Sequence, residues 1–287
     1  MPELPEVETI VRDLRPHLTG RILRNPKLFK TDVLRRVSPR RLLATVRNNT
    51  VEEVTRRAKH VVLRLATGER IVIQPRMTGN ILVYDRRLRR GEERYIVFRA
   101  AIGSGQSLVY RDVRRLGTIA LLDARAWESY TQAIGPEPLT TDFTAERFRN
   151  ILRGTRQAIK KALMDQRLLA GVGNIYANEA LFRAGIDPSR RADRIGPDDA
   201  ERLHDAVRGV LAAALAAGGT TFRDYRNVAG DPGAYQHDLL VYGRDGLPCV
   251  RCGTRLHTTH AIDNRSTTFC WRCQGRDAPA ANRPRAF

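Results

Sequence analysis

The first hydrophobic pattern of the chain predicts an amphipathic helix that begins within the first ten residues. Apolar side chains recur at the spacing that gathers them on one helical face: Val7, Ile10, Val11, Leu14 and Leu18. Pro5 suits the first turn of such a helix, and Glu6 complements the positive end of its dipole. The start of the chain is therefore expected to be held against a core.

From about residue 40 to 122 the pattern changes to short β-branched runs. They lie at 61–65, 71–73, 81–84, 95–98, 107–110 and 118–122. Closely spaced runs of this kind are typical of an all-β sandwich or barrel. The first part of the chain is thus expected to be a β-sandwich with an opening helix.

Beyond residue 130 the pattern becomes helical. Residues 131–144 combine two prolines with polar residues and are the best linker candidate. Helical spacing follows at 145–153, 156–166, 173–184 and 198–217. The stretch 218–236 is rich in turn residues and longer than a connection needs, so it is a candidate functional lid.

The net charge of the chain predicts what kind of partner it binds. The chain has 50 Lys and Arg against 31 Asp and Glu, a formal net charge of +19. Such an excess on a globular chain predicts a polyanionic partner, with nucleic acid first and an anionic membrane surface second. The acidic start does not resemble a secretory signal, and no apolar run approaches the roughly 18 residues of a membrane span. We therefore expect a cytoplasmic protein.

All the cysteines lie near the end of the chain, as Cys249-x2-Cys252-x17-Cys270-x2-Cys273. Two close pairs in a reducing compartment predict a tetrahedral four-thiolate zinc site, although scattered structural cysteines are the plain alternative. Four protein ligands leave no open position, so the zinc is expected to be structural. Arg251 lies within the first pair, Arg255 and Arg265 lie between the pairs, and all three are expected to face a phosphate backbone.

Several motifs occur in a fixed order. They are PELPEVET at 2–9, RRAK at 56–59, RMTG at 76–79, DVRRLG at 112–117, MDQ at 164–166 with GVGNIYANEALF at 171–182, GGTT at 218–221 and the cysteine module. Together they closely resemble the formamidopyrimidine-DNA glycosylase family over nearly the whole chain. Leu4 favours the purine-repair branch over the endonuclease VIII branch.

The resemblance implies an α+β multidomain fold. Residues 1–132 are expected to form the catalytic β-sandwich, and 133–240 a helical domain with a helix–two-turns–helix unit and a lesion loop. Residues 241–277 are expected to form the zinc finger and 278–287 a flexible tail. The implied partner is double-stranded DNA that contains an oxidised base or an abasic site. The protein is expected to be a monomer and not to bind a membrane.

The resemblance also implies the chemistry. If Met1 is removed, Pro2 presents an α-amine with a pKa of about 8, far below the 10.4 of lysine, so more of it is nucleophilic at neutral pH. Glu3 is the implied general acid/base. Glu6 either shapes the same pocket or only complements the helix dipole. The implied reaction is base excision with strand cleavage by β,δ-elimination.

Further positions match residues that the family places on DNA. Lys59 and Arg265 are counted with the catalytic set and, together with Asn174, hold the backbone so that the nucleotide turns out. Asn174 is alternatively a simple N-cap. Met77, Arg114 and Leu116 match the positions that fill the gap left by the base and meet the orphaned partner. Lys160 is expected to border the flipped base, and Gln74 is counted with the DNA-binding residues.

Two departures from the family pattern stand out. Gln74 replaces a commoner histidine, and Leu116 replaces the usual phenylalanine, which predicts a weaker wedge because leucine cannot stack as an aromatic ring does. Two other functions remain open at this point. One is an endonuclease VIII-like glycosylase for oxidised pyrimidines, and the other is a non-catalytic zinc-ribbon binder of DNA damage.

Overall fold

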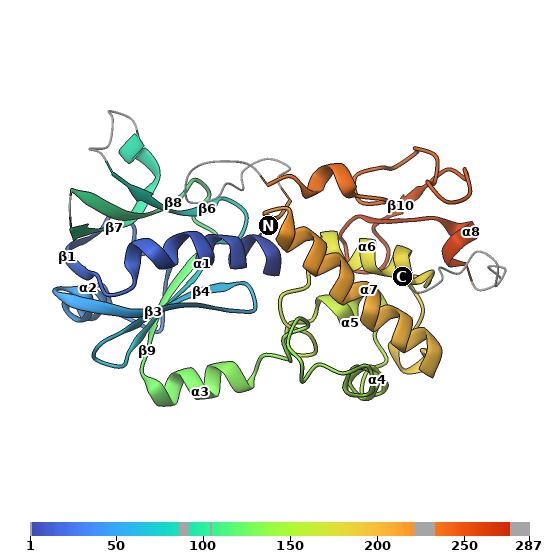
Figure 1. Cartoon of the computed structure of the whole chain (residues 1–287), viewed down its shortest axis with the longest axis horizontal. Helices are drawn as coiled ribbons and strands as arrows, with labels where there is room; N and C mark the ends of the chain where they lie inside the picture. Colours follow the sequence, from blue (N-terminus) through green and yellow to red (C-terminus); the bar gives the residue numbers. More distant parts are fainter. Residues whose placement is uncertain (1, 86–91, 104, 221–232, 276–287) are drawn as a thin grey trace. The chain divides into compact units, whose positions relative to one another are not determined.

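The computed structural model describes residues 2–85, 92–103, 105–220 and 233–275, which fall into two compact units (Figure 1). The first unit contains residues 1–133 and 215–236, and the second contains 134–214 and 237–287. The described residues of the segment 215–236, which are 215–220 and 233–236, group with the first unit, whereas the sequence analysis placed them in the helical domain. The expected flexible tail at 278–287 lies outside the described residues, as does most of the expected lid.

The first unit is built around a sheet. Its strands are β1 (Ile22–Leu28), β2 (Leu34–Arg35), β3 (Asn49–Arg57), β4 (His60–Leu65), β5 (Arg70–Gln74), β6 (Gly79–Tyr84), β7 (Ile96–Gly103), β8 (Gln106–Asp112) and β9 (Thr118–Leu122). Within the described residues they are hydrogen-bonded in the order β2-β9-β5-β4-β3-β1-β7-β8-β6. The pairs are antiparallel except for β2 with β9. All six predicted strand runs are found.

The opening helix α1 (Leu4–Leu18) supplies one side of the core. Its predicted apolar face is buried, from Val7 at 0% relative exposure to Leu18 at 0%. The same cluster contains Val61 and Ile73 from one end of the sheet and Ile81 from the other, so α1 and strands on both sides of the β3–β1 junction share one core. Burying apolar side chains in this way stabilises each by about 1.5–3 kcal/mol.

Two helices of this unit were not predicted. Helix α2 (Pro39–Val46) has Ser38 as its N-cap, whose hydroxyl accepts from the Arg41 amide, and Pro39 is its first residue. Helix α3 (Ala124–Gln132) has Asp123 as its N-cap. It packs on the outer face of the sheet, where Val62, Val72 and Leu122 are buried. A 3-10 turn, η1 (Glu92–Tyr95), precedes β7, so the predicted strand at 95–98 begins one residue later.

The second unit is mainly helical. Its helices are α4 (Ala145–Arg153), α5 (Ile159–Met164), α6 (Asn174–Ala184), α7 (Pro197–Ala216) and α8 (Trp271–Gln274), and its two short strands are β10 (His257–Thr259) and β11 (Thr267–Phe269). The 3-10 turns are η2 (Ala192–Arg194) and η3 (Tyr235–Asp238), the second of which straddles the boundary between the units. The prediction at 156–166 was too long, because Ala158 pairs with Arg191 before α5 begins.

A buried carboxylate ties α6 to the start of the cysteine region. Glu179 is fully buried and accepts hydrogen bonds from the amides of Leu240, Val241 and Tyr242 at 2.8–3.0 Å. Burial raises the pKa of Glu179, and the three amide bonds oppose that rise. The cysteine region is thereby anchored to a helix through three consecutive amides.

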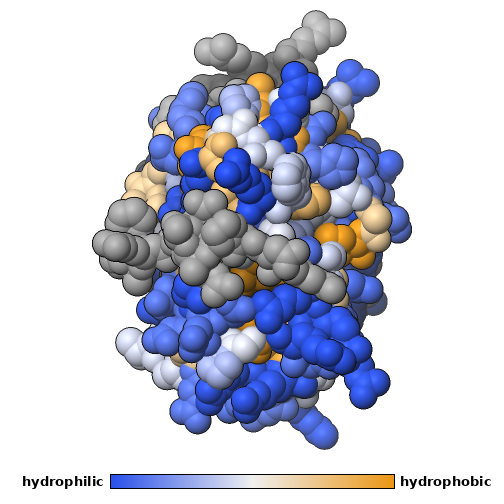
Figure 2. Space-filling model, turned by 90° about the vertical axis from the view of Figure 1, so that its right-hand side faces the viewer, coloured by the Kyte–Doolittle hydropathy of each residue, from blue (hydrophilic) through white to orange (hydrophobic). Residues whose placement is uncertain are grey.

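The face of the molecule drawn in Figure 2 is predominantly polar. Figure 2 shows a face on which hydrophilic side chains dominate and hydrophobic ones occur in small groups, as expected for a chain of this net charge. Among the described residues, no helix combines the length and apolarity needed to cross a bilayer.

Candidate functional site

The start of α1 holds the predicted nucleophile position and two carboxylates. Pro2 is buried, and Glu3 and Glu6 are exposed by only 2% and 1%. The Glu6 carboxylate accepts from the Glu3 amide at 2.7 Å, and the two residues form a capping box. This reciprocal pairing satisfies amides at the helix start and fixes the backbone next to Pro2.

A segment more than two hundred residues away meets the same glutamate. The Thr220 amide donates to Glu6 Oε1 at 2.7 Å. Gly219 has φ +89°, and a Cβ built there would lie 2.9 Å from Glu6 Cγ. Glu6 therefore joins the beginning of α1 to the GGTT motif, which goes beyond the pocket-shaping or dipole roles that the sequence left open.

Lys59 lies at the tip of the hairpin between β3 and β4. Arg57 pairs with His60, so Ala58 and Lys59 are the two turn residues, and Ala58 has φ +51°. Lys59 is exposed by only 4%. Its side chain is thus enclosed by protein rather than spread in solvent.

The three predicted gap-filling residues are all exposed and lie on two adjacent loops. Met77 is 46% exposed and Leu116 41% exposed, and Arg114 Nη1 lies 3.6 Å from Met77 Sδ. Large apolar side chains exposed together on a basic chain suit insertion between bases. The structure therefore brings Met77 and Arg114 into contact and leaves Leu116 free to reach outward.

A buried aspartate that the sequence reasoning missed organises these loops. Asp112 is 1% exposed, and its carboxylate accepts from the Thr78 hydroxyl and from the Gly117 amide at 2.8 Å. The Thr78 hydroxyl in turn accepts from the Arg114 amide at 3.0 Å. Burial first, and then the adjacent Asp112 carboxylate, raises the pKa of Tyr110. The place of Asp112 at the head of DVRRLG was the available signal.

Gln74, the position where the family usually has histidine, is the last residue of β5. Its side-chain oxygen accepts from Arg76 Nε at 3.2 Å. Arg76 is exposed and has φ +52°. Its hydrogen bond to Gln74 orients its guanidinium. The amide therefore holds a cation at this edge, which the sequence reasoning did not foresee.

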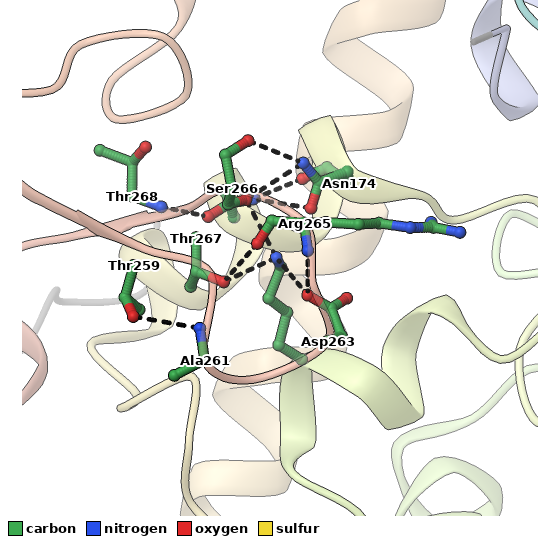
Figure 3. A network of polar contacts seen from close by, with 10 residues as sticks. Asn174, Thr259, Ala261, Asp263, Arg265, Ser266, Thr267 and Thr268 are labelled. Atoms are coloured by element: carbon green, nitrogen blue, oxygen red, sulfur yellow. Dashed lines mark hydrogen bonds and ion pairs between the residues drawn. The ribbon is translucent and has the colours of Figure 1, made fainter.

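In the second unit, Asn174 and Arg265 lie next to Ser266 (Figure 3). Asn174 Nδ2 donates to the Ser266 carbonyl at 3.1 Å and lies 3.3 Å from its hydroxyl. Gly173 occupies the N-cap of α6, so the simple N-cap interpretation of Asn174 is wrong. The exposed Arg265 side chain extends away from this network in Figure 3.

Lys160 has a different environment from the DNA-facing one expected. Its side chain is fully buried, and its ammonium donates to the Ser266 carbonyl at 3.0 Å and to Thr267 Oγ1 at 2.8 Å. Asp263 Oδ1 lies 3.4 Å from the ammonium and also accepts from the Arg265 amide. In this structure Lys160 therefore contacts the loop that carries Arg265, and it is not exposed to a DNA surface.

The cysteine sulfurs converge on one point. All four Sγ atoms of Cys249, Cys252, Cys270 and Cys273 lie within 4.8 Å of one another, with pairs at 3.4, 3.5 and 3.9 Å. Tetrahedral Zn–S bonds of about 2.3 Å require sulfurs about 3.8 Å apart. The cluster is therefore of the size that can hold a metal ion.

Arg251 is exposed, and its guanidinium is also bound to the end of α6. Its guanidinium donates to the carbonyls of Phe182 and Arg183 at 2.9 and 3.1 Å and lies 4.5 Å from the Phe182 ring centroid. It thus satisfies carbonyls at the end of α6, where a cation also complements the helix dipole. Burial outweighs the neighbouring thiols and lowers the pKa of this guanidinium.

Comparison with known proteins decides the family. Residues 1–119 match the formamidopyrimidine-DNA glycosylase N-terminal domain, and residues 134–226 match the H2TH domain of the same glycosylase. The chain belongs to the formamidopyrimidine-DNA glycosylase family. It is 42% identical to the formamidopyrimidine-DNA glycosylase of Thermomicrobium roseum, over 96% of this chain and 99% of that one. A relative from Desulforamulus reducens is 40% identical over the same shares.

Solved structures of the glycosylase family have the same fold. The protein from Thermus thermophilus superposes with a TM-score of 0.84 at 37% identity, over 96% of this chain and 99% of that chain. A Lactococcus lactis mutant in complex with DNA containing Fapy-dG superposes with a TM-score of 0.88 at 30% identity, over 96% and 100%. The predictions of family, fold class and enzyme class are confirmed.

Proposed function

We propose that this member of the family is a bifunctional DNA glycosylase/AP lyase that removes 8-oxoguanine and formamidopyrimidines from duplex DNA. The observation that carries the proposal is the buried start of α1, where Pro2 adjoins Glu3 and Glu6 fixes the backbone. Family membership supports the reaction class. The basic chain and the exposed Met77 and Leu116 support a duplex substrate.

The chemistry begins once Met1 is removed and Pro2 has a free secondary amine. The amine nitrogen attacks C1′ of the flipped nucleotide, and the bond between C1′ and the base breaks, so the base leaves with the bonding electrons and takes up a proton. The attacking nitrogen gives up its proton, and the C1′–O4′ bond then breaks with O4′ taking up a proton, which opens the sugar ring and leaves an iminium between Pro2 and C1′. The resulting iminium acidifies the C2′ proton, whose removal expels the 3′ phosphate, and a second elimination expels the 5′ phosphate. Glu3 is the group nearest in sequence that can relay protons.

The remaining site residues are proposed to hold the substrate. Lys59, Asn174 and Arg265 bind phosphates around the extruded nucleotide. Met77 and Leu116 fill the gap, and Arg114 donates to the orphaned base. Asp112 supports this last group, because it fixes the loop from which Arg114 and Leu116 extend.

The four cysteines are proposed to hold one structural zinc ion. The spacing of the sulfurs fits tetrahedral thiolate ligation, and a bound metal would lock the two turns that carry the thiolates. Thiolate ligands suit a reducing compartment, so we infer that the protein works in the bacterial cytoplasm. The family resemblance supports a monomer.

Lys160 is proposed to act on DNA through Arg265 rather than by direct contact. Its ammonium bonds to atoms of Ser266 and Thr267 and pairs with Asp263, which also receives the Arg265 amide. A buried ammonium with these partners fixes the course of the loop. Arg265 is thereby presented to solvent from a rigid support.

Borohydride trapping on an abasic duplex tests the central proposal. We expect a covalent protein–DNA adduct, with tandem mass spectrometry locating the DNA on Pro2. Pro2→Gly should bind the duplex with similar affinity and excise the base at least a hundredfold more slowly. Absence of an adduct, or an adduct on another residue, contradicts the assigned nucleophile.

Substrate preference is tested separately. Single-turnover cleavage should be faster on 8-oxoguanine paired with cytosine than on thymine glycol paired with adenine. The reverse order would favour an oxidised-pyrimidine glycosylase while leaving the Pro2 chemistry intact.

A further inference from the structure

The turn that carries Lys59 has a backbone that needs outside support. Ala58 is in the left-handed region at φ +51°, a conformation that costs an alanine free energy because of its Cβ. Such residues persist where surrounding contacts determine them. Lys59 follows directly and is almost completely enclosed, so a displacement of the turn backbone carries the ammonium with it.

One support is a hydrogen-bonded chain through His60. Its Nδ1 lies 3.1 Å from the Arg57 carbonyl, and its Nε2 lies 2.9 Å from the Tyr130 hydroxyl. Burial lowers the pKa of His60 to about 4, so the ring is neutral at pH 7 and has one N–H. A carbonyl can only accept, so Nδ1 donates to Arg57 and Nε2 accepts from the Tyr130 hydroxyl.

The same helix also holds the other strand of the hairpin. Arg57 Nη2 donates to the Thr131 carbonyl of α3 at 3.3 Å. Because Arg57 and His60 are the last paired residues before the turn, both ends of the turn are attached to α3. The helix is itself anchored, since Trp127 and Tyr130 pack on buried side chains of the outer face of the sheet.

We propose that the hydrogen bond from Tyr130 to His60 positions Lys59 for phosphate binding, making Tyr130 and His60 positioning residues of the reaction. The proposal rests on the proposed role of Lys59 at the DNA backbone. Tyr130 and His60 themselves need not touch DNA. They set the direction of the Lys59 ammonium through the two ends of a strained turn.

Tyr130→Phe is the variant of choice, because it removes the hydroxyl and keeps the ring that packs on Trp127 and His60. Loss of one hydrogen bond of ordinary strength should slow single-turnover cleavage of an abasic duplex roughly three- to tenfold. Ser129→Ala is the matched control, since it removes a hydroxyl of α3 that bonds to the Arg125 carbonyl. It should cleave at the wild-type rate.

A double-mutant cycle with Lys59→Met separates positioning from general loss of stability. If Tyr130 acts through Lys59, Tyr130→Phe/Lys59→Met should cleave no more slowly than Lys59→Met alone. His60→Gln, whose side-chain oxygen can still accept from Tyr130, should retain more activity than His60→Leu. A structural role alone would slow the double variant by the product of the two single effects.

Each outcome decides the inference. Wild-type cleavage by Tyr130→Phe, or multiplicative effects in the cycle, overturns it while leaving the role of Lys59 in place. Unchanged cleavage by Lys59→Met removes the proposed role of Lys59 and the positioning inference with it. Both results differ from a failure of borohydride trapping, which concerns Pro2 alone.

Discussion

The ammonium of Lys160 lies 2.8 Å from Thr267 Oγ1, although 107 residues separate the two along the chain. The contact joins α5 to the first residue of β11 and leaves Arg265 exposed two positions earlier. A lysine expected at a DNA surface is instead part of the second unit's interior.

Lys160→Met should therefore lower the free energy of unfolding by about 3 kcal/mol, because Asp263 would lose its buried cationic partner. Urea denaturation measures this change, and fluorescence anisotropy should show weaker duplex binding. In Lys160→Met/Asp263→Leu, which removes both charges, much of the stability should return. A single variant as stable as the wild type would contradict the importance of the pair.

Leu116→Phe should tighten binding to an abasic-site duplex by about 1 kcal/mol, because an exposed aromatic ring at the wedge position can stack on a neighbouring base. Titration with a fluorescent duplex measures the gain. Val113→Phe adds the same ring at another exposed position of this loop and should bind as the wild type does. Equal gains in both variants would mean that added apolar surface, rather than the wedge position, is responsible.

His60 should make the first unit less stable as the solution is acidified. The folded-state pKa is about 4, below the ordinary 6.5, owing first to burial and also to the positive charges of Lys59, Arg76 and Arg57. The unfolded chain therefore binds the proton first, and stability is lost as pH falls from 6.5 to 4, by up to about 3 kcal/mol. Urea titrations across this range should show a shallower pH slope for His60→Gln, and an unchanged slope would exclude His60 as the source.

Cys270→Ser should release the proposed zinc and weaken duplex binding at least tenfold, because metal binding and local folding are coupled in such modules. Plasma mass spectrometry measures the metal content, and anisotropy measures the affinity. Thr254→Ser, a conservative change in the same region, should retain one metal ion per chain. A metal-free variant with normal affinity would show that the module is dispensable for binding.

The main elements could be predicted because their periodicity is strong. Helix α4 was predicted with its actual bounds, and the buried face of α1 matched residue by residue. Helix α2 was missed because its arginines and β-branched neighbours obscure the apolar spacing, although Ser38-Pro39 is a start signal. Helix α3 was missed because its contacts are made by Trp127 and Tyr130 at one edge only.

The motifs of the sequence indicated candidate site residues, but they did not indicate the long-range contacts that hold those residues in place. Met77, Arg114 and Leu116 are exposed, and the roles that the family resemblance implied for them stay predictions. Lys160 was misplaced because its partner Asp263 lies 103 residues away, and sequence spacing says nothing about such contacts. The hydrogen bonds of the exposed Arg251 to Phe182 and Arg183 were not predicted for the same reason, because these residues lie 69 and 68 positions away.

The close approach of Gly219 to Glu6 constrains how this protein can diverge. A methyl group at position 219 would press on the glutamate and on the backbone beside it, as well as strain its own φ of +89°. Replacing Glu6 by a smaller residue would make room for that methyl group, but the Thr220 amide would lose its hydrogen-bond acceptor. The effect of a substitution at position 219 therefore depends on the residue at position 6, and the reverse. We expect the two positions to change together during evolution.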